Sequence, residues 1–135
     1  MSFHRTRGLA IFTFALALTL SSSAGVAQQP AVERKVLLQE DLNIPGYQAT
    51  LVEVRIPVGG REGRHSHPGA ALVHVLEGVI TLDYEGKPTK AYNPGESFYV
   101  EPGKIHEGIN RGNVPIRAIA SFVTKKGDPL TVPAP

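Results

Sequence analysis

The chain has 135 residues, with 14 Lys and Arg against 12 Asp and Glu, 14 glycines, 11 prolines and no cysteine or tryptophan. This length fits one small domain, and a content of 41% hydrophobic and 19% charged residues excludes a disordered polyelectrolyte and an integral membrane protein. The many glycines and prolines favour strands and turns, and without cysteine any metal must be held by histidine and carboxylate.

Residues 1–27 have the three parts of a secretory signal peptide. Arg5 and Arg7 give a positive start, and residues 9–20 form an apolar run that is too short to span a bilayer comfortably, with small residues after it. We expect cleavage before Gln28, export to the periplasm or the medium, and no stable membrane anchor afterwards. An uncleaved N-terminal anchor is the alternative.

The expected cleavage changes the charge of the chain. Residues 28–135 carry 12 Lys and Arg against 12 Asp and Glu, so their formal net charge is zero. The basic character of the full chain belongs to the expected signal segment, and aromatic and basic residues are not interleaved. We therefore expect no nucleic-acid partner.

The remaining chain is predicted to be an all-β domain between two irregular ends. Residues 28–45 are expected to form an arm whose apolar run at 36–38 can serve as an edge strand, and residues 125–135 a loose, Pro-rich tail. Between them, short apolar or alternating runs are separated by turn residues. The predicted strands are 48–56, 71–76, 79–84, 97–100 and 116–124. This spacing is typical of an antiparallel barrel or sandwich.

Three of the four histidines after residue 27 lie in segments bounded by Gly and Pro. His65 and His67 are one residue apart, so an extended chain points both rings to the same face. His106 follows a Pro-Gly turn, which a barrel can place opposite the first pair. Three imidazoles with open positions beside them are typical of a catalytic metal site.

These segments resemble the two motifs of the cupin family. Residues 59–78 match the first motif, which consists of glycine, five residues, His-x-His, three or four residues, glutamate, six residues and glycine. Residues 95–110 match the second motif, with Glu101 where a proline is usual. The resemblance implies a six- to eight-stranded antiparallel β-barrel, a jelly-roll-like double-stranded β-helix, over residues 46–124. It also implies a homodimer.

The first motif departs from the family pattern at one position. Where the family has a glutamate as the fourth metal ligand, this chain has Ala71. The resemblance therefore implies a divalent ion held by His65, His67 and His106 alone, as in three-histidine cupin dioxygenases, with Fe, Zn, Ni, Mn, Cu or Co as candidates. Three neutral imidazoles leave the charge of the ion uncompensated and favour an anionic ligand. A site that has lost its metal is the alternative.

Other polar residues near the motifs are weaker candidates. Glu62, just before the histidine pair, can turn inward as an additional ligand or as a general base, and Glu107 is expected to point away from the site; solvent exposure is the expected state of both. Arg61 and Arg64 flank the pair and can attract an anion or simply lie on the surface. His74 is expected on the opposite face of its strand, in the sheet or at a dimer interface.

Two classes of function are compatible with these residues. The first is an exported single-domain cupin that binds a divalent metal through three histidines and acts on a small, anionic molecule, for example as a dioxygenase. The second is a non-catalytic periplasmic module that binds a small molecule or a metal. An accessible pocket at the histidines would favour the first class, because one fold hosts many activities and only the site distinguishes them.

Overall fold

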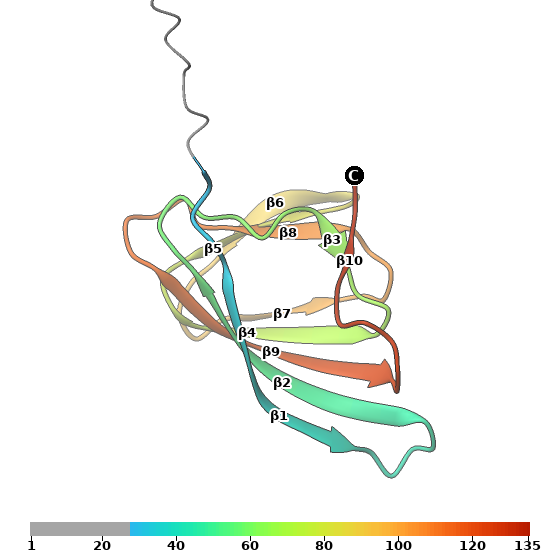
Figure 1. The fold of residues 1–135 in the computed structure, drawn as a ribbon. Coiled ribbons are helices and arrows are strands. Elements are labelled where there is room, and N and C mark those ends of the chain that lie inside the picture. Colours follow the sequence, from blue (N-terminus) through green and yellow to red (C-terminus); the bar gives the residue numbers. More distant parts are fainter. Residues whose placement is uncertain (1–27) are drawn as a thin grey trace, which may run out of the picture.

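Figure 1 shows the computed structural model of the chain, which describes residues 28–135. The predicted signal peptide, residues 1–27, lies outside the described residues. The regular structure of the described part consists of ten strands in two five-stranded sheets. This part contains no helix that is long and apolar enough to cross a membrane.

The two sheets are antiparallel throughout and lie over each other as two layers (Figure 1). The strands of the first sheet, in spatial order, are β1 (Glu33–Asp41), β2 (Tyr47–Ile56), β9 (Ile116–Lys125), β4 (Ala70–Glu77) and β7 (Ser97–Val100). The strands of the second sheet are β10 (Val132–Pro133), β3 (His65–Ser66), β8 (His106–Ile109), β5 (Ile80–Tyr84) and β6 (Lys87–Tyr92).

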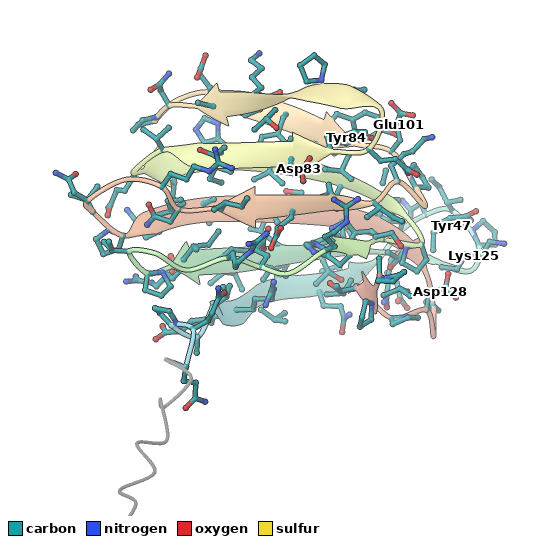
Figure 2. All side chains as sticks on the ribbon, turned by 90° about the horizontal axis from the view of Figure 1, so that it is seen from above. Tyr47, Asp83, Tyr84, Glu101, Lys125 and Asp128 are labelled. Atoms are coloured by element: carbon teal, nitrogen blue, oxygen red, sulfur yellow. The ribbon has the colours of Figure 1, made fainter. Side chains whose placement is uncertain are left out.

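β2 and β9 are the longest paired strands of the first sheet. Their ten residues pair over the full length, from Tyr47 opposite Lys125, both labelled in Figure 2, to Ile56 opposite Ile116. Alternate residues of both strands face the second sheet, and Ile56 and Ile116 are 1% and 0% exposed. The alternation of apolar and polar residues therefore places one face of this sheet in the core, as expected for a half-buried strand pair.

The predicted all-β antiparallel fold is confirmed, and the five predicted strands appear as β2, β4, β5, β7 and β9. Three further strands lack a sequence signal. β6 has the sequence KPTKAY, without apolar alternation, and its residues are almost all exposed. β3 and β8 are short and contain the site histidines, so their pairing depends on the neighbouring strands rather than on local propensity.

The expectation of a loose C-terminal tail is wrong. Residues 132–133 pair with β3 and form the edge strand β10 of the second sheet. The Ala134 N–H donates to the Arg64 carbonyl at 2.9 Å, and Leu130 packs against the core. The open edge of β3 offers backbone groups that need partners, and the last residues of the chain supply them.

The N-terminal arm forms β1, a long strand at the edge of the first sheet. It pairs with β2 from Glu33 to Asp41 and includes residues 36–38, where the register shifts. All nine residues of β1 are exposed. The predicted role of this strand in a homodimer stays a prediction.

Gly69, directly before β4, has no room for a side chain. A Cβ at this position would lie 2.0 Å from the Val123 carbonyl oxygen and 2.8 Å from Thr124 Cγ2. Gly69→Ala should lower the free energy of unfolding by about 3 kcal/mol, measured by urea unfolding followed by far-UV circular dichroism. Gly112→Ala, whose nearest contact is 3.4 Å away, is the control. Equal midpoints for the two variants would contradict this close approach of the chain to β9.

Candidate metal centre

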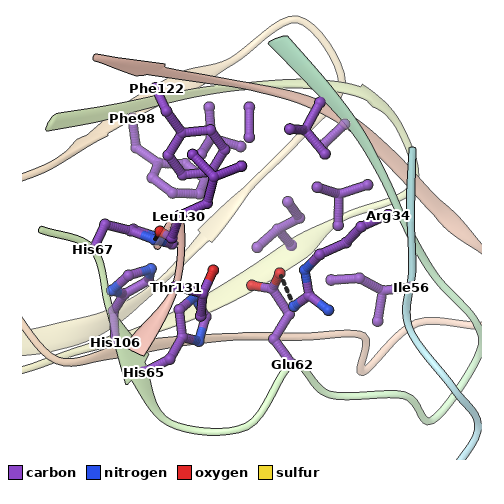
Figure 3. A pocket seen from close by; sticks show the side chains of 16 residues that line it. Arg34, Ile56, Glu62, His65, His67, Phe98, His106, Phe122, Leu130 and Thr131 are labelled. Atoms are coloured by element: carbon purple, nitrogen blue, oxygen red, sulfur yellow. Dashed lines mark hydrogen bonds and ion pairs between the residues drawn. The ribbon is translucent and has the colours of Figure 1, made fainter. Parts of the chain in front are cut away.

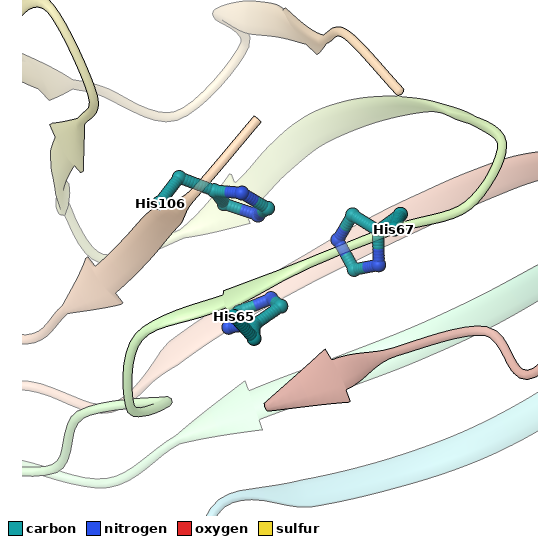
Figure 4. A group of neighbouring side chains, drawn as sticks. All are labelled: His65, His67 and His106. Atoms are coloured by element: carbon teal, nitrogen blue, oxygen red, sulfur yellow. The ribbon is translucent and has the colours of Figure 1, made fainter. Parts of the chain in front are cut away.

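Three histidines from the second sheet and its connecting loop meet in the interior (Figure 4). His65 begins β3, His67 follows β3 directly, and His106 begins β8. β3 and β8 are paired so that His65 lies opposite His106. The three side chains are 4–5% exposed, and their ring centroids lie 4.4–4.9 Å apart. The structure thus brings together the three histidines that the sequence predicted as ligands.

Each imidazole has its Nδ1 against a backbone carbonyl. The pairs are His65 with Gly63 at 2.7 Å, His67 with Leu130 at 2.6 Å, and His106 with Lys104 at 3.0 Å. A carbonyl oxygen only accepts, so in the neutral ring Nδ1 carries the proton and Nε2 keeps its lone pair. Backbone carbonyls orient histidine ligands in metal sites in the same way.

The donor set fits a divalent metal ion. The candidate ligand atoms of the three residues all lie within 4.8 Å of one another, so the three side chains could hold one ion. Burial lowers the pKa of His67 and of His106 from 6.5 to about 4. The nearby imidazoles and the positive charge of Arg34 lower the pKa of His67 further, whereas the Leu130 carbonyl opposes the shift. Both rings are therefore neutral near pH 7, as metal binding requires.

The histidines form the polar end of an otherwise largely apolar pocket between the sheets (Figure 3). Phe98 and Phe122 belong to its wall, and Phe122 stands edge-on to His67 with the ring centroids 4.9 Å apart. The cavity measures about 60 Å³. One water needs about 10–15 Å³ of such space, so this cavity accepts a ligand of only a few non-hydrogen atoms.

Ala71 is fully buried and offers no ligand where the family has a glutamate. Glu62 is the acidic residue among those that line the pocket, which corrects the expectation that it is solvent-exposed: its side chain is 16% exposed. Its Oε1 accepts a hydrogen bond from Arg34 at 3.1 Å, and its Oε2 accepts one from the Gly108 N–H at 3.2 Å. These two donors compensate the carboxylate for the loss of water.

Glu107 also differs from its expected exposure, because its side chain is 1% exposed. Arg61 donates to both carboxylate oxygens, with Nε at 2.6 Å, and the Gly63 N–H donates to one of them at 3.0 Å. The Arg61 hydrogen bonds, more than any other contact, hold the pKa of Glu107 below its ordinary value of 4.5. As predicted, Glu107 points away from the histidines. The ion pair joins the loop before His65 to β8.

The remaining polar candidates lie outside the inner pocket. Arg64 forms a surface ion pair with Asp83 at 3.2 Å, and His74 is exposed on β4, where its Nδ1 lies 2.8 Å from the Ser97 hydroxyl oxygen. The basic residue that does line the pocket, apart from the histidines, is Arg34 of β1. Sequence reasoning missed Arg34 because β1 is exposed along its whole length and its charged and apolar residues do not alternate, so no period marks one of them as pointing inward.

The fold and the buried histidines define a small β-barrel protein with a site that could bind metal. A family model, the cupin domain, matches residues 52–122. The chain belongs to the cupin family, as the two motifs predicted. It is 34% identical over 108 residues to germin-like protein subfamily T member 3 of Arabidopsis thaliana, which covers 76% of this chain and 45% of that protein. The chain thus spans less than half the length of this relative.

Solved structures share the fold at low sequence identity. A double-stranded β-helix protein of Klebsiella pneumoniae has a TM-score of 0.63 and 20% identity over 79% of this chain and 90% of its own. The DMSP lyase of Ruegeria pomeroyi has a TM-score of 0.58 and 21% identity over 64% of this chain and 43% of its own. An oxalate oxidase in complex with glycolate has a TM-score of 0.56 and 22% identity over 63% of this chain and 45% of its own. A lyase and an oxidase on one fold show that the reaction must be argued from the site.

The metal-free protein should lose stability as the pH falls from 6.5 towards 4. In this interval the unfolded chain protonates His67 and His106 while the folded chain keeps them neutral, so the unfolded state binds more protons and the free energy of unfolding decreases. Urea unfolding with a chelator at about pH 7, 6 and 5 measures this slope. His67→Gln should flatten it, whereas the exposed-site control His74→Gln should not. The same slope in wild type and His67→Gln would refute the depressed pKa.

The C-terminal segment should fix the tautomer of His67. Nitrogen-15 NMR of the metal-free protein near neutral pH should show the Nδ1–H form for all three rings, because each Nδ1 faces a carbonyl. Truncation after Gly127 removes the Leu130 carbonyl and should shift His67 towards the Nε2–H form. Truncation after Thr131 removes β10 but keeps Leu130, and His106 is an internal control. An unchanged His67 in the shorter chain would refute this role of the tail.

Proposed function

We propose that this chain is an exported cupin that binds one divalent metal ion through His65, His67 and His106 and acts on a small anionic molecule. The observation that carries the proposal is the common orientation of the three rings. All three are buried, and each is bound through Nδ1 to a carbonyl, so that Nε2 is available to an ion. Such an arrangement is typical of preformed histidine metal sites.

A divalent ion at this site would act as a Lewis acid that holds an anionic oxygen and polarises the group attached to it. The protein itself supplies a largely apolar pocket and two charged side chains, Arg34 and Glu62. The apolar wall with Phe98 and Phe122 limits access of water, Arg34 brings a positive charge, and the Glu62 carboxylate orients Arg34 beside the histidines. The oxalate oxidase of the same fold holds glycolate, a small carboxylate, and its name and ligand support an anionic substrate here as well.

Dioxygenation is the reaction that we propose first, on the resemblance to three-histidine cupins. The second candidate is a non-catalytic module that holds a metal or a small ligand. Ala71, which replaces the usual carboxylate ligand, and the small cavity of about 60 Å³ favour this second candidate. Export and assembly as a homodimer through β1 belong to the same proposal and rest on residues 1–27 and on the exposed edge strand.

Metal content tests the proposal. Protein exported with its own signal and purified without chelators should contain about one metal ion per chain by plasma mass spectrometry, as a three-ligand site predicts. The double variant His65→Ala, His106→Ala should lose the ion, whereas His74→Ala should keep it. Oxygen consumption with an iron-containing sample then separates a dioxygenase from a binding module. A wild type that contains no metal and takes up neither Zn²⁺ nor Fe²⁺ on reconstitution would refute the proposal.

A further inference from the structure

Arg34 lines two neighbouring cavities. It lines the inner cavity of about 60 Å³ that contains the histidines, and also an outer recess of about 290 Å³. Glu62, His65 and Thr131 line both spaces as well. Figure 3 shows the Arg34 side chain reaching from β1 to Glu62, on the side of the pocket across from His67 and His106. Arg34 thus has access both to the space beside the histidines and to the outer recess.

The guanidinium of Arg34 has most of its hydrogen-bonding capacity unused. Its Nη2 donates to Glu62 Oε1 at 3.1 Å, which is its one side-chain hydrogen bond among the described residues. A guanidinium has five N–H donors, so the other four can bind a ligand. The side chain is 40% exposed, which leaves it enough freedom to adjust to a ligand.

Glu62 is the fixed member of this pair. Its backbone N–H donates to the Gly108 carbonyl at 3.0 Å, and the Gly108 N–H donates back to Glu62 Oε2 at 3.2 Å. A Cβ on Gly108 would lie 2.6 Å from Oε2, so the glycine makes room for the carboxylate. Both ends of Glu62 are therefore held against β8, and its remaining oxygen orients Arg34.

Two other arginines lie near the histidine pair, but neither reaches the inner cavity, and Arg64 lines only the outer recess. Arg61 is bound through two nitrogens to the buried Glu107, and Arg64 is paired with Asp83. Arg34 is the arginine in the described chain that combines unused donors with access to that cavity.

We propose that Arg34 binds the carboxylate of the ligand while Glu62 holds the guanidinium in place, so that the pocket selects small monocarboxylates with an apolar body. The inference deepens the proposed function and rests on it, since it names the side chain that pairs with the charge of the proposed anionic ligand. A guanidinium matches a carboxylate in shape and charge, and the apolar wall strengthens this pairing by excluding water. The apolar wall fits the body of such a ligand, and the small cavity limits its length.

Calorimetric titration with propionate and its neutral isostere propionamide tests this inference. The wild-type chain, both reconstituted with Zn²⁺ and metal-free, should bind propionate about tenfold more tightly than propionamide, as expected for a charge-assisted pair. Arg34→Gln should abolish this preference in the metal-free chain and reduce it in the Zn²⁺ form, where the ion still attracts an anion. The matched control Arg64→Gln changes an arginine of the outer recess whose side chain is 41% exposed, against 40% for Arg34, and it should keep the wild-type preference in both forms.

The outcomes separate this inference from the proposed function. A preference that is unchanged in Arg34→Gln, or no propionate binding to wild type at millimolar concentrations, overturns the role of Arg34. The zinc content of the same samples reports on the histidine site independently. If the wild type takes up neither Zn²⁺ nor Fe²⁺, the proposed function fails, and the comparison on the metal-free chain still decides the role of Arg34. Far-UV circular dichroism and the unfolding midpoint verify that each variant is folded.

Discussion

The pairing of β3 with β8 in a single register is the constraint on which the site depends. It places His65 opposite His106, with both rings on the pocket side. Because side chains alternate along a strand, a slip by one residue would turn His106 away and bring Glu107 inward. The Arg61–Glu107 ion pair holds the same two segments together outside the pocket. The register is thus fixed by a polar contact outside the pocket, and the inner face remains available for the three imidazoles.

Burial and the backbone carbonyls together determine the chemical state of the imidazoles. Desolvation makes the charged ring unfavourable, which lowers the pKa of His67 and His106, and the carbonyls at Nδ1 determine where the single remaining proton lies. The lone pairs on Nε2 then face a cavity with apolar walls. In the described chain the hydrogen bonds of the three rings are made through Nδ1, so the Nε2 lone pairs are available to an incoming cation.

Strands and site residues could be predicted from the sequence where side chains alternate along a strand or where a motif has a fixed spacing. Alternation in residues 48–56 and 116–124 predicted the paired strands β2 and β9, and the His-x-His segment with the later His106 predicted the cluster. Contacts between distant segments had no such signal. Arg61 and Glu107 are 46 positions apart in the chain, and their pairing follows from the β3–β8 register, so Glu107 could not be predicted as buried. The ordered tail was missed for the same reason, since its partner is the open edge of β3.

The residues that line the histidine pocket come partly from the region that matches the cupin domain and partly from segments outside it. The three histidines lie within residues 52–122, the part that matches the cupin domain. Arg34 lies before this part, and Leu130 and Thr131 follow it, yet all three line the pocket. In this chain, segments outside the matched region therefore complete the pocket around the histidine cluster. They are β1 and the C-terminal segment, where a similarity in the motifs carries no information.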